Sequence, residues 1–174
     1  MELYTVTGNN LDSQACIRNN NIVGAGTSLP AWDMEGTRKA FTIFGNITAD
    51  PRFSTSITLI ENYGMEGVRA FDSASTSLAT EEREYPVVAS PVLWWDGDDE
   101  QTTEDAYAYA NAMREALYTG VDKSEDERHC YVNYANGGEK NPEMYGYGSR
   151  LERLVGLKKQ WDPSNRFGYY NSFV

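Results

Sequence analysis

A long apolar run at residues 85–95 constrains the fold more than any other segment. It is rich in valine and tryptophan, but it also carries Pro86 and Pro91. Because proline has no backbone N–H for a β-ladder, it is found at strand ends, bulges and sheet edges. We therefore predict a strand in this run. Its prolines should lie either on an edge strand of the sheet or at the ends of the strand.

Two shorter segments before this run also have the composition of strands. Residues 39–48 contain Phe-Thr-Ile-Phe and residues 55–63 contain Ser-Ile-Thr-Leu-Ile, with turn signals between them. We predict that they form neighbouring antiparallel strands. Upstream, Gly24-Ala25-Gly26 lacks the third glycine of a dinucleotide-binding loop, because position 29 is leucine. We interpret it as a plain turn.

Amphipathic periodicity predicts two helices in the second half of the chain. Residues 103–118 carry an apolar stripe and begin at Thr103, a good N-cap residue. Residues 149–161 begin with a Ser149–Glu152 capping box. Between them, residues 129–136 are predicted to form a strand. These elements together predict an α+β fold, in which helices pack on an antiparallel or mixed β-sheet.

Charge and composition limit the classes of function. The net charge is −11, with 26 acidic against 15 basic residues, so nucleic-acid binding is not expected. No apolar run approaches the roughly 20 residues of a membrane span, and the first ten residues do not resemble a signal peptide. We therefore expect a cytoplasmic protein that does not interact with membranes.

The single histidine restricts catalytic chemistry further. His129 is next to Cys130, and neighbours on a strand point to opposite faces, so they cannot act as a nucleophile pair. With no second histidine and no Cys-x-x-Cys pair, a Ser-His-Asp triad is excluded and no metal site is expected. The same alternation would place Tyr131 and Asn133 on one face and Tyr134 on the other.

The last third of the chain resembles the C-terminal signature of berberine-bridge-enzyme-like (BBE-like) FAD-linked oxidases. Four pieces match in order and spacing: Tyr131-Val-Asn-Tyr134, Tyr145-Gly146 or Tyr147-Gly148, Arg150-Leu-Glu-Arg-Leu154 with Leu157-Lys158-Lys159, and Trp161-Asp-Pro-Ser-Asn-Arg-Phe167. Residues 69–95 resemble the substrate-domain sheet of the family more weakly. The resemblance implies one domain over residues 1–174, substrate-domain-like at 1–128 and a BBE-type C-terminal segment at 129–174.

The resemblance also implies roles for particular residues. In many family members the second tyrosine of Tyr-x-Asn-Tyr is the catalytic base near the flavin, a role that maps to Tyr134, and the asparagine lies beside the flavin pocket. An ionised phenol needs nearby positive charge or strong hydrogen bonds, because its ordinary pKa is near ~10. Our candidate catalytic residues are Tyr134 and Tyr131, and our candidate substrate-binding residues are Trp94, Asn133 and Trp95.

The resemblance does not extend to an FAD-binding module. Family members attach FAD through a histidine, and often a cysteine, in an N-terminal module that has no match here, and His129 and Cys130 lie in a different segment. We therefore expect no cofactor, or FAD only if the chain pairs with an FAD-binding chain.

Two main hypotheses follow for the function. The first is a flavin-free, non-redox catalyst that acts on an apolar small metabolite, such as a cyclase of the Diels–Alder type or a double-bond isomerase. The second is a subunit or fragment of an FAD-linked oxidoreductase that works with a separate FAD-binding chain. A third is a protein that only binds a ligand. The aromatic tail, residues 165–174, would expose apolar surface on an isolated chain, so we expect a homodimer or a partner chain.

Overall fold

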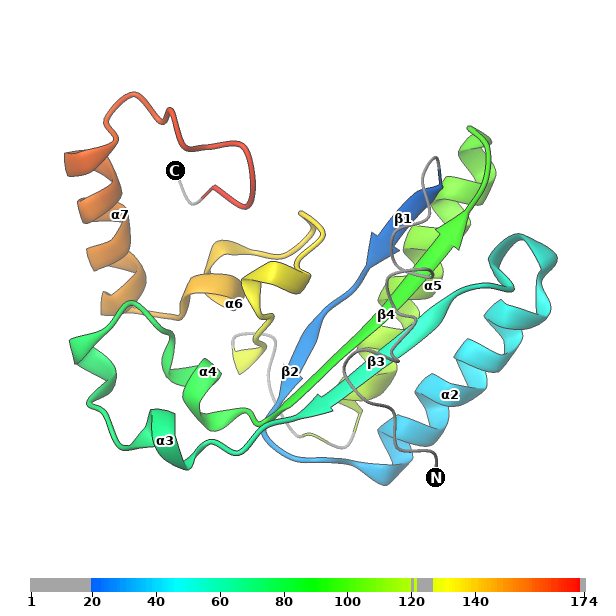
Figure 1. The fold of residues 1–174 in the computed structure, drawn as a ribbon, viewed down its shortest axis with the longest axis horizontal. Coiled ribbons are helices and arrows are strands. Elements are labelled where there is room, and N and C mark those ends of the chain that lie inside the picture. The colour runs from blue at the N-terminus through cyan, green and yellow to red at the C-terminus, as the bar shows by residue number, and fades with distance from the viewer. Residues whose placement is uncertain (1–19, 120, 122–126, 173–174) are drawn as a thin grey trace, which may run out of the picture.

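A computed structural model describes residues 20–119, 121 and 127–172 of the chain. Its longer elements are β1 (Asn21–Gly24), β2 (Thr27–Leu29), α2 (Met34–Ala49), β3 (Ile57–Asn62), β4 (Val87–Trp95), α5 (Glu100–Tyr118) and α7 (Ser149–Trp161). Shorter helices are η2 (Pro51–Phe53), α3 (Glu66–Arg69), η3 (Ser73–Ser75), α4 (Thr80–Glu84), η5 (Val132–Tyr134) and α6 (Asn141–Tyr145). The strands form an antiparallel sheet, and α2 and α5 lie together on one of its faces (Figure 1). The predicted α+β class is confirmed.

Strand β4 is the centre of the sheet, so the prediction of an edge strand at residues 85–95 is wrong. It pairs with β3 on one side and with both β1 and β2 on the other. Pro91 is tolerated in a central strand because the strand edge that carries its nitrogen faces the interruption between β1 and β2. There the amide of Ala25 donates to the carbonyl of Pro91 at 3.2 Å, so only one ladder donor is missing.

Residues 39–48 are not a strand but part of helix α2. The side chain of Asp33 caps this helix by accepting a hydrogen bond from the amide of Gly36 at 2.6 Å. Gly36 also permits close packing on α5, since a Cβ there would come within 2.6 Å of the carbonyl oxygen of Thr119 and 2.7 Å of that of Ala116. The local preference for a strand is weak and is outweighed by this tertiary packing.

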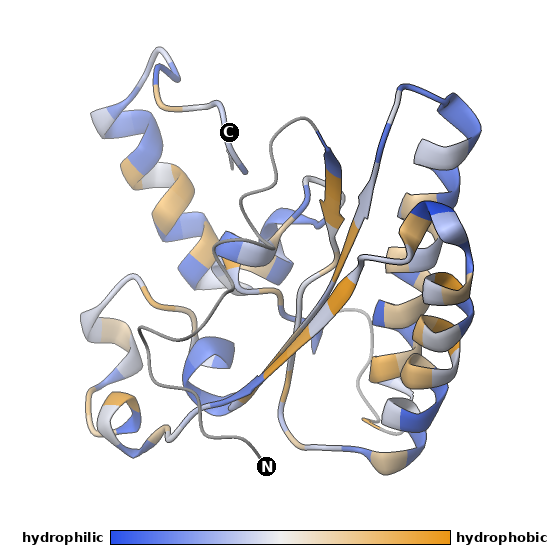
Figure 2. Cartoon of the chain, turned by 45° about the vertical axis from the view of Figure 1, so that its right-hand side comes forward, coloured by the Kyte–Doolittle hydropathy of each residue, from blue (hydrophilic) through white to orange (hydrophobic). Residues whose placement is uncertain are grey.

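The hydrophobic core lies between the sheet and the two long helices. Phe53 is fully buried there, and its ring meets Trp95 edge-on at 6.4 Å and Tyr109 at 5.8 Å between centroids. Leu93 of β4 and Met113 of α5 belong to the same cluster. Figure 2 shows hydrophobic residues in the strands, and helices in which hydrophobic and hydrophilic residues alternate around the turns, as expected for elements that bury one face.

Both predicted helices are present, but they begin differently. Helix α5 starts at Glu100, and its N-cap is Asp99 instead of Thr103, because Asp99 Oδ2 accepts from the amide of Thr102 at 2.7 Å. Helix α7 starts after Gly148, which serves as the N-cap without a side-chain bond. The predicted Ser149–Glu152 capping box is therefore not formed.

Residues 129–136 do not form the predicted strand. His129 makes a single bridge to Ser28 of β2, and the chain then turns through the 3₁₀ helix η5. A one-residue bridge cannot impose the alternation of a strand, so the predicted division of side chains between two faces fails here.

Candidate functional site

The turn η5 brings together three of the predicted site residues. The rings of Tyr131 and Tyr134 lie 5.8 Å apart between centroids, tilted by 46°. The amide of Asn133 donates to the hydroxyl oxygen of Tyr131 at 2.8 Å. Because the segment is a turn, these side chains form one group instead of lying on opposite sides of a strand.

Tyr134 links this turn to the sheet. Its hydroxyl donates to Oε2 of Glu61 on β3 at 2.7 Å. Glu61 is in register with Val88, whose neighbours Val87 and Ala89 pack toward the helices. Side chains alternate along a strand, so Glu61 stands on the opposite face of the sheet, away from α2 and α5.

The neighbours of Tyr134 favour its neutral form. Burial, and then the hydrogen bond to the Glu61 carboxylate, raise the pKa of Tyr134 above its ordinary value. The pKa of Tyr63 is also raised, by partial burial and then by the Glu61 carboxylate. The ionised Tyr134 considered from the sequence is therefore replaced by a phenol that donates to a carboxylate.

A pocket of about 390 Å³ opens beside this pair. Strand β1 contributes Ile22 to its wall, and the turn contributes Asn133 and Tyr134. Tyr107 from α5 and Tyr170 from the C-terminal tail complete an aromatic lining. The pocket can therefore hold an apolar or aromatic group next to Tyr134, whereas Glu61 is not among its lining residues.

The predicted residues Trp94 and Trp95 do not lie together. Trp95 belongs to the core on the helix side, where its ring meets Phe53. Trp94 is on the face that carries Glu61 and is only 4% exposed, and its register partner is the pocket residue Ile22. Neither tryptophan lines the pocket beside Tyr134, and their contacts with a substrate stay predictions.

Sequence reasoning missed Glu61, Tyr63, Tyr107 and Tyr170. A signal did exist for Glu61, since it is the only charged residue within the predicted strand at residues 55–63. Its partner Tyr134 lies 73 positions away, so only the fold could identify the pair. Tyr107 and Tyr170 carry no local signal that separates them from other surface tyrosines.

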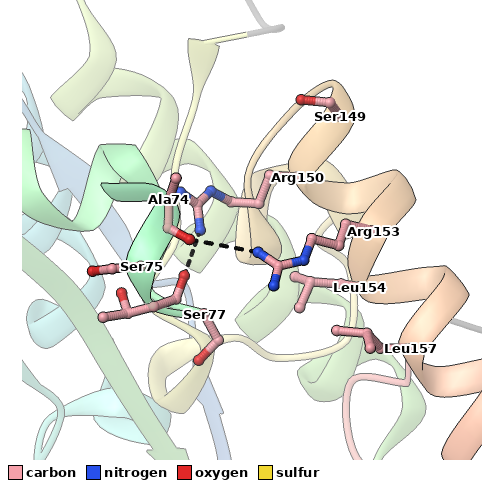
Figure 3. Close-up of a pocket in the computed structure, with 9 residues that line it drawn as sticks. Ala74, Ser75, Ser77, Ser149, Arg150, Arg153, Leu154 and Leu157 are labelled. Atoms are coloured by element: carbon pink, nitrogen blue, oxygen red, sulfur yellow. Dashed lines mark hydrogen bonds between the residues drawn. The ribbon is translucent and has the colours of Figure 1, made fainter. Parts of the chain in front are cut away.

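A second cavity, of about 330 Å³, lies between α7 and residues 74–77. Figure 3 shows two arginines of α7 directed at the backbone of this segment. Arg150 donates to the carbonyl of Thr76 at 3.0 Å, and Arg153 donates to that of Ala74 at 3.5 Å. The arginines thus attach α7 to the rest of the fold, which explains the Arg-Leu piece of the sequence signature in structural terms.

The far end of α7 and the tail expose a set of large apolar side chains. The exposed fraction is 79% for Trp161 and 85% for Phe167, and Tyr169 is fully exposed. We call these residues, with Leu157 at 40%, the C-terminal apolar surface. No residue of α7 is buried in the described part of the chain. An exposed apolar surface of this kind is typical of an interaction site.

The pocket beside Tyr134 does not fit a complete FAD. Its lining contains no lysine or arginine, and a pyrophosphate normally requires cations or a cluster of free backbone amides. Elsewhere in the described part of the chain, no group of three potential metal ligands occurs, and no helix is long and apolar enough to cross a membrane.

Comparison with known proteins agrees with this arrangement. The family described as berberine and berberine-like matches residues 130–172. An FAD-linked oxidoreductase of Penicillium rubens, chyH, is 33% identical over 144 residues, which are 82% of this chain and 28% of that protein. The chain spans about a quarter to a third of the length of the first curated relatives that it matches.

Solved structures share the fold. A xylooligosaccharide oxidase from Myceliophthora thermophila superposes with a TM-score of 0.66 at 20% identity, over 88% of this chain and 32% of that one. The berberine bridge enzyme superposes with a TM-score of 0.64 at 14% identity, over 90% of this chain and 33% of that one.

The fold and the site thus define an α+β domain in which an antiparallel sheet backed by helices presents a tyrosine–carboxylate pair. More specifically, the chain is similar to the C-terminal part of BBE-like FAD-linked oxidoreductases.

Proposed function

We propose that the chain supplies the substrate-binding face and the proton acceptor of an FAD-linked oxidoreductase, with FAD held by a separate module. The observation that carries this proposal is that Tyr134, which lines an open pocket, donates a hydrogen bond to Glu61. The FAD-linked relatives support the reaction class, and the C-terminal apolar surface supports a partner module.

The pair can accept a proton without an ionised phenol. As the oxygen of Tyr134 takes the proton of a substrate hydroxyl, the phenolic proton passes to Oε2 of Glu61, so Tyr134 stays neutral and Glu61 becomes a carboxylic acid. The raised pKa of Tyr134 is compatible with this relay, since it disfavours a stored phenolate and a concerted transfer needs none. The electron acceptor would belong to the FAD-binding module.

A chimera tests the proposal. Residues 20–174 would replace the matching C-terminal part of the chyH protein, and flavin absorbance would be followed through gel filtration and during anaerobic mixing with substrates of the parent enzyme. We expect retained flavin that substrate reduces, and a Tyr134→Phe chimera that is slower by roughly 10- to 150-fold. A flavin-loaded chimera whose reduction does not depend on Tyr134 would contradict the proposal.

A second candidate is the flavin-free catalyst, a cyclase of the Diels–Alder type or a double-bond isomerase. It is favoured by the fact that a phenol–carboxylate pair can move a proton, or donate to a carbonyl, without any electron acceptor. Conjugated carbonyl compounds incubated in D₂O with the purified chain, without FAD, would test it by mass spectrometry. Deuterium incorporation or cyclisation that Glu61→Gln abolishes would support it, and unchanged compounds would count against it.

A further inference from the structure

Two hydrogen bonds attach the C-terminal tail to the turn that carries Tyr134, and a third attaches it to α6. The hydroxyl of Tyr170 donates to the carbonyl of Ala135 at 2.9 Å. The side-chain amide of Asn171 donates to the carbonyl of Val132 at 3.2 Å. The carbonyl of Asn171 in turn accepts from the hydroxyl of Tyr145 at 2.5 Å. The tail therefore contacts both ends of η5, immediately before Asn133 and immediately after Tyr134.

The turn has a small number of other backbone supports. Within it, the amide of Tyr134 donates to the carbonyl of Tyr131 at 2.8 Å, and the amide of Ala135 donates to the carbonyl of Val132 at 3.3 Å, which is a long bond. On the sheet side, the amide of Gly26 donates to the carbonyl of Tyr134, also at 3.3 Å. A short 3₁₀ helix has poor hydrogen-bond geometry of its own, so its orientation depends on what holds it from outside.

The tail is itself fixed by a local hydrogen-bond cluster at the end of α7. The carboxylate of Asp162 accepts from the amides of Arg166 at 2.8 Å and Phe167 at 3.0 Å, and it pairs with Lys158. Lys158 also donates to the carbonyl of Phe167 at 2.8 Å. These contacts reverse the chain after α7 and direct it back toward η5.

Tyr170 also lines the pocket. It borders the same cavity as Tyr134 and Tyr107, while its hydroxyl donates to the carbonyl of Ala135. A single side chain thus contacts both the space for the substrate and the backbone beside the candidate catalytic residue.

We propose that Tyr170 and Asn171 are positioning residues, which hold the η5 turn so that Tyr134 meets Glu61, and that the ring of Tyr170 is a specificity-determining wall of the pocket. This inference rests on the proposed role of the Tyr134–Glu61 pair, but it can fail independently. Its consequence is that residues far from the sheet control the geometry of the proton relay.

The experiment follows the phenol of Tyr134 directly. The full chain is labelled with ¹³C at Cζ of tyrosine, the Tyr134 signal is assigned with Tyr134→Phe, and its pKa is measured by NMR titration. In Tyr170→Phe, we expect the pKa of Tyr134 to fall toward the ordinary value by roughly one unit, because the bond to Glu61 loosens. Tyr169→Phe is the matched control, since Tyr169 is its fully exposed neighbour, and it should leave the signal unchanged.

Two further variants separate the possible outcomes. Asn171→Gly removes the bond to Val132 while tolerating the positive φ of 46° at this position, and it should move the Tyr134 signal as Tyr170→Phe does. Glu61→Gln must lower the pKa of Tyr134 if the pair exists. A shift with Glu61→Gln but none with either tail variant would overturn the positioning role and leave the proposed function intact. No shift with Glu61→Gln would remove the pair on which both rest.

Discussion

Gly26 and Tyr134 are in direct backbone contact, and no other residue type fits at the glycine. The amide of Gly26 donates to the carbonyl of Tyr134 at 3.3 Å, and a Cβ on Gly26 would lie 2.5 Å from Cβ of Tyr134 and 2.9 Å from its carbonyl oxygen. The Gly-Ala-Gly segment is not the plain turn interpreted from the sequence, because the chain continues from β1 to β2 along β4 in one register, and Gly26 lies directly against the candidate catalytic turn.

Gly26→Ala should therefore push the η5 turn away from the sheet. We expect the free energy of unfolding to fall by about 1–3 kcal/mol, as for other overpacked sites. Urea denaturation would measure this effect. Gly45→Ala is the control, because a Cβ at Gly45 meets nothing within 4 Å and the position lies inside α2, so it should stabilise the protein by about 0.5–1 kcal/mol. Equal effects of the two substitutions would contradict the close contact.

The raised pKa of Tyr134 predicts a specific loss of stability in alkali. The neutral phenol is favoured in the folded state, so its contribution is complete below the unfolded pKa near ~10 and is lost as pH rises through the higher folded value. Between pH about 10 and 12, wild type should lose more stability than Tyr134→Phe. The comparison with Tyr134→Phe is needed because burial also raises the pKa of Tyr118, to about 12. Parallel pH profiles for the two proteins would show that Tyr134 titrates normally.

The carboxylate of Asp162 predicts the opposite dependence for the tail. Its pKa is lowered by Lys158 and then by the backbone amides of Phe167 and Arg166. The tail contacts should therefore be complete above the unfolded pKa near ~3.9 and be lost as pH falls through the lower folded value. Asp162→Asn should loosen the tail even at neutral pH. Faster hydrogen exchange at residues 165–172, with the core unchanged, would be the measured sign, whereas unchanged exchange would argue against this cluster.

Phe53 should be the most costly of the aromatic residues to remove from the helix side. It is fully buried between Trp95 and Tyr109, so Phe53→Ala should destabilise the fold by about 3–5 kcal/mol. Phe41→Ala removes the same side chain from a position that is 48% exposed on α2, and it should cost well under about 1 kcal/mol. Chemical denaturation of both variants would compare them, and a small loss for Phe53→Ala would be inconsistent with the described core.

The C-terminal apolar surface predicts self-association or capture of a partner. Replacing Trp161 and Phe167 by glutamine should leave the unfolding free energy nearly unchanged, because both side chains are largely exposed. The same change should shift any concentration-dependent species in sedimentation velocity toward the monomer. A wild-type chain that is monomeric at all concentrations, with or without an FAD-binding module, would count against an interaction role for this surface.

The sequence predicted the class of fold and the segment of the site, but not how strands and helices are distributed. Residues 39–48 have strand-forming side chains, yet the Asp33 cap and the contact of Gly36 with α5 make them helical. Pro91 suggested an edge, and only the interruption between β1 and β2 explains its central position. Tyr134 was identified through the family resemblance, whereas Glu61 required the tertiary structure, because no local pattern relates residues so far apart in the chain.

The central position of β4 has a consequence for how the site opens. Glu61 belongs to β3, which is paired along its length with β4. The amide protons in this ladder should be among the last in the molecule to exchange. Tyr134 belongs to a short turn supported by an exposed tail, and such segments open at a much smaller free-energy cost. The two halves of the proton relay thus lie in cooperative units of different stability, so the relay could be disconnected by a local fluctuation that leaves the sheet folded.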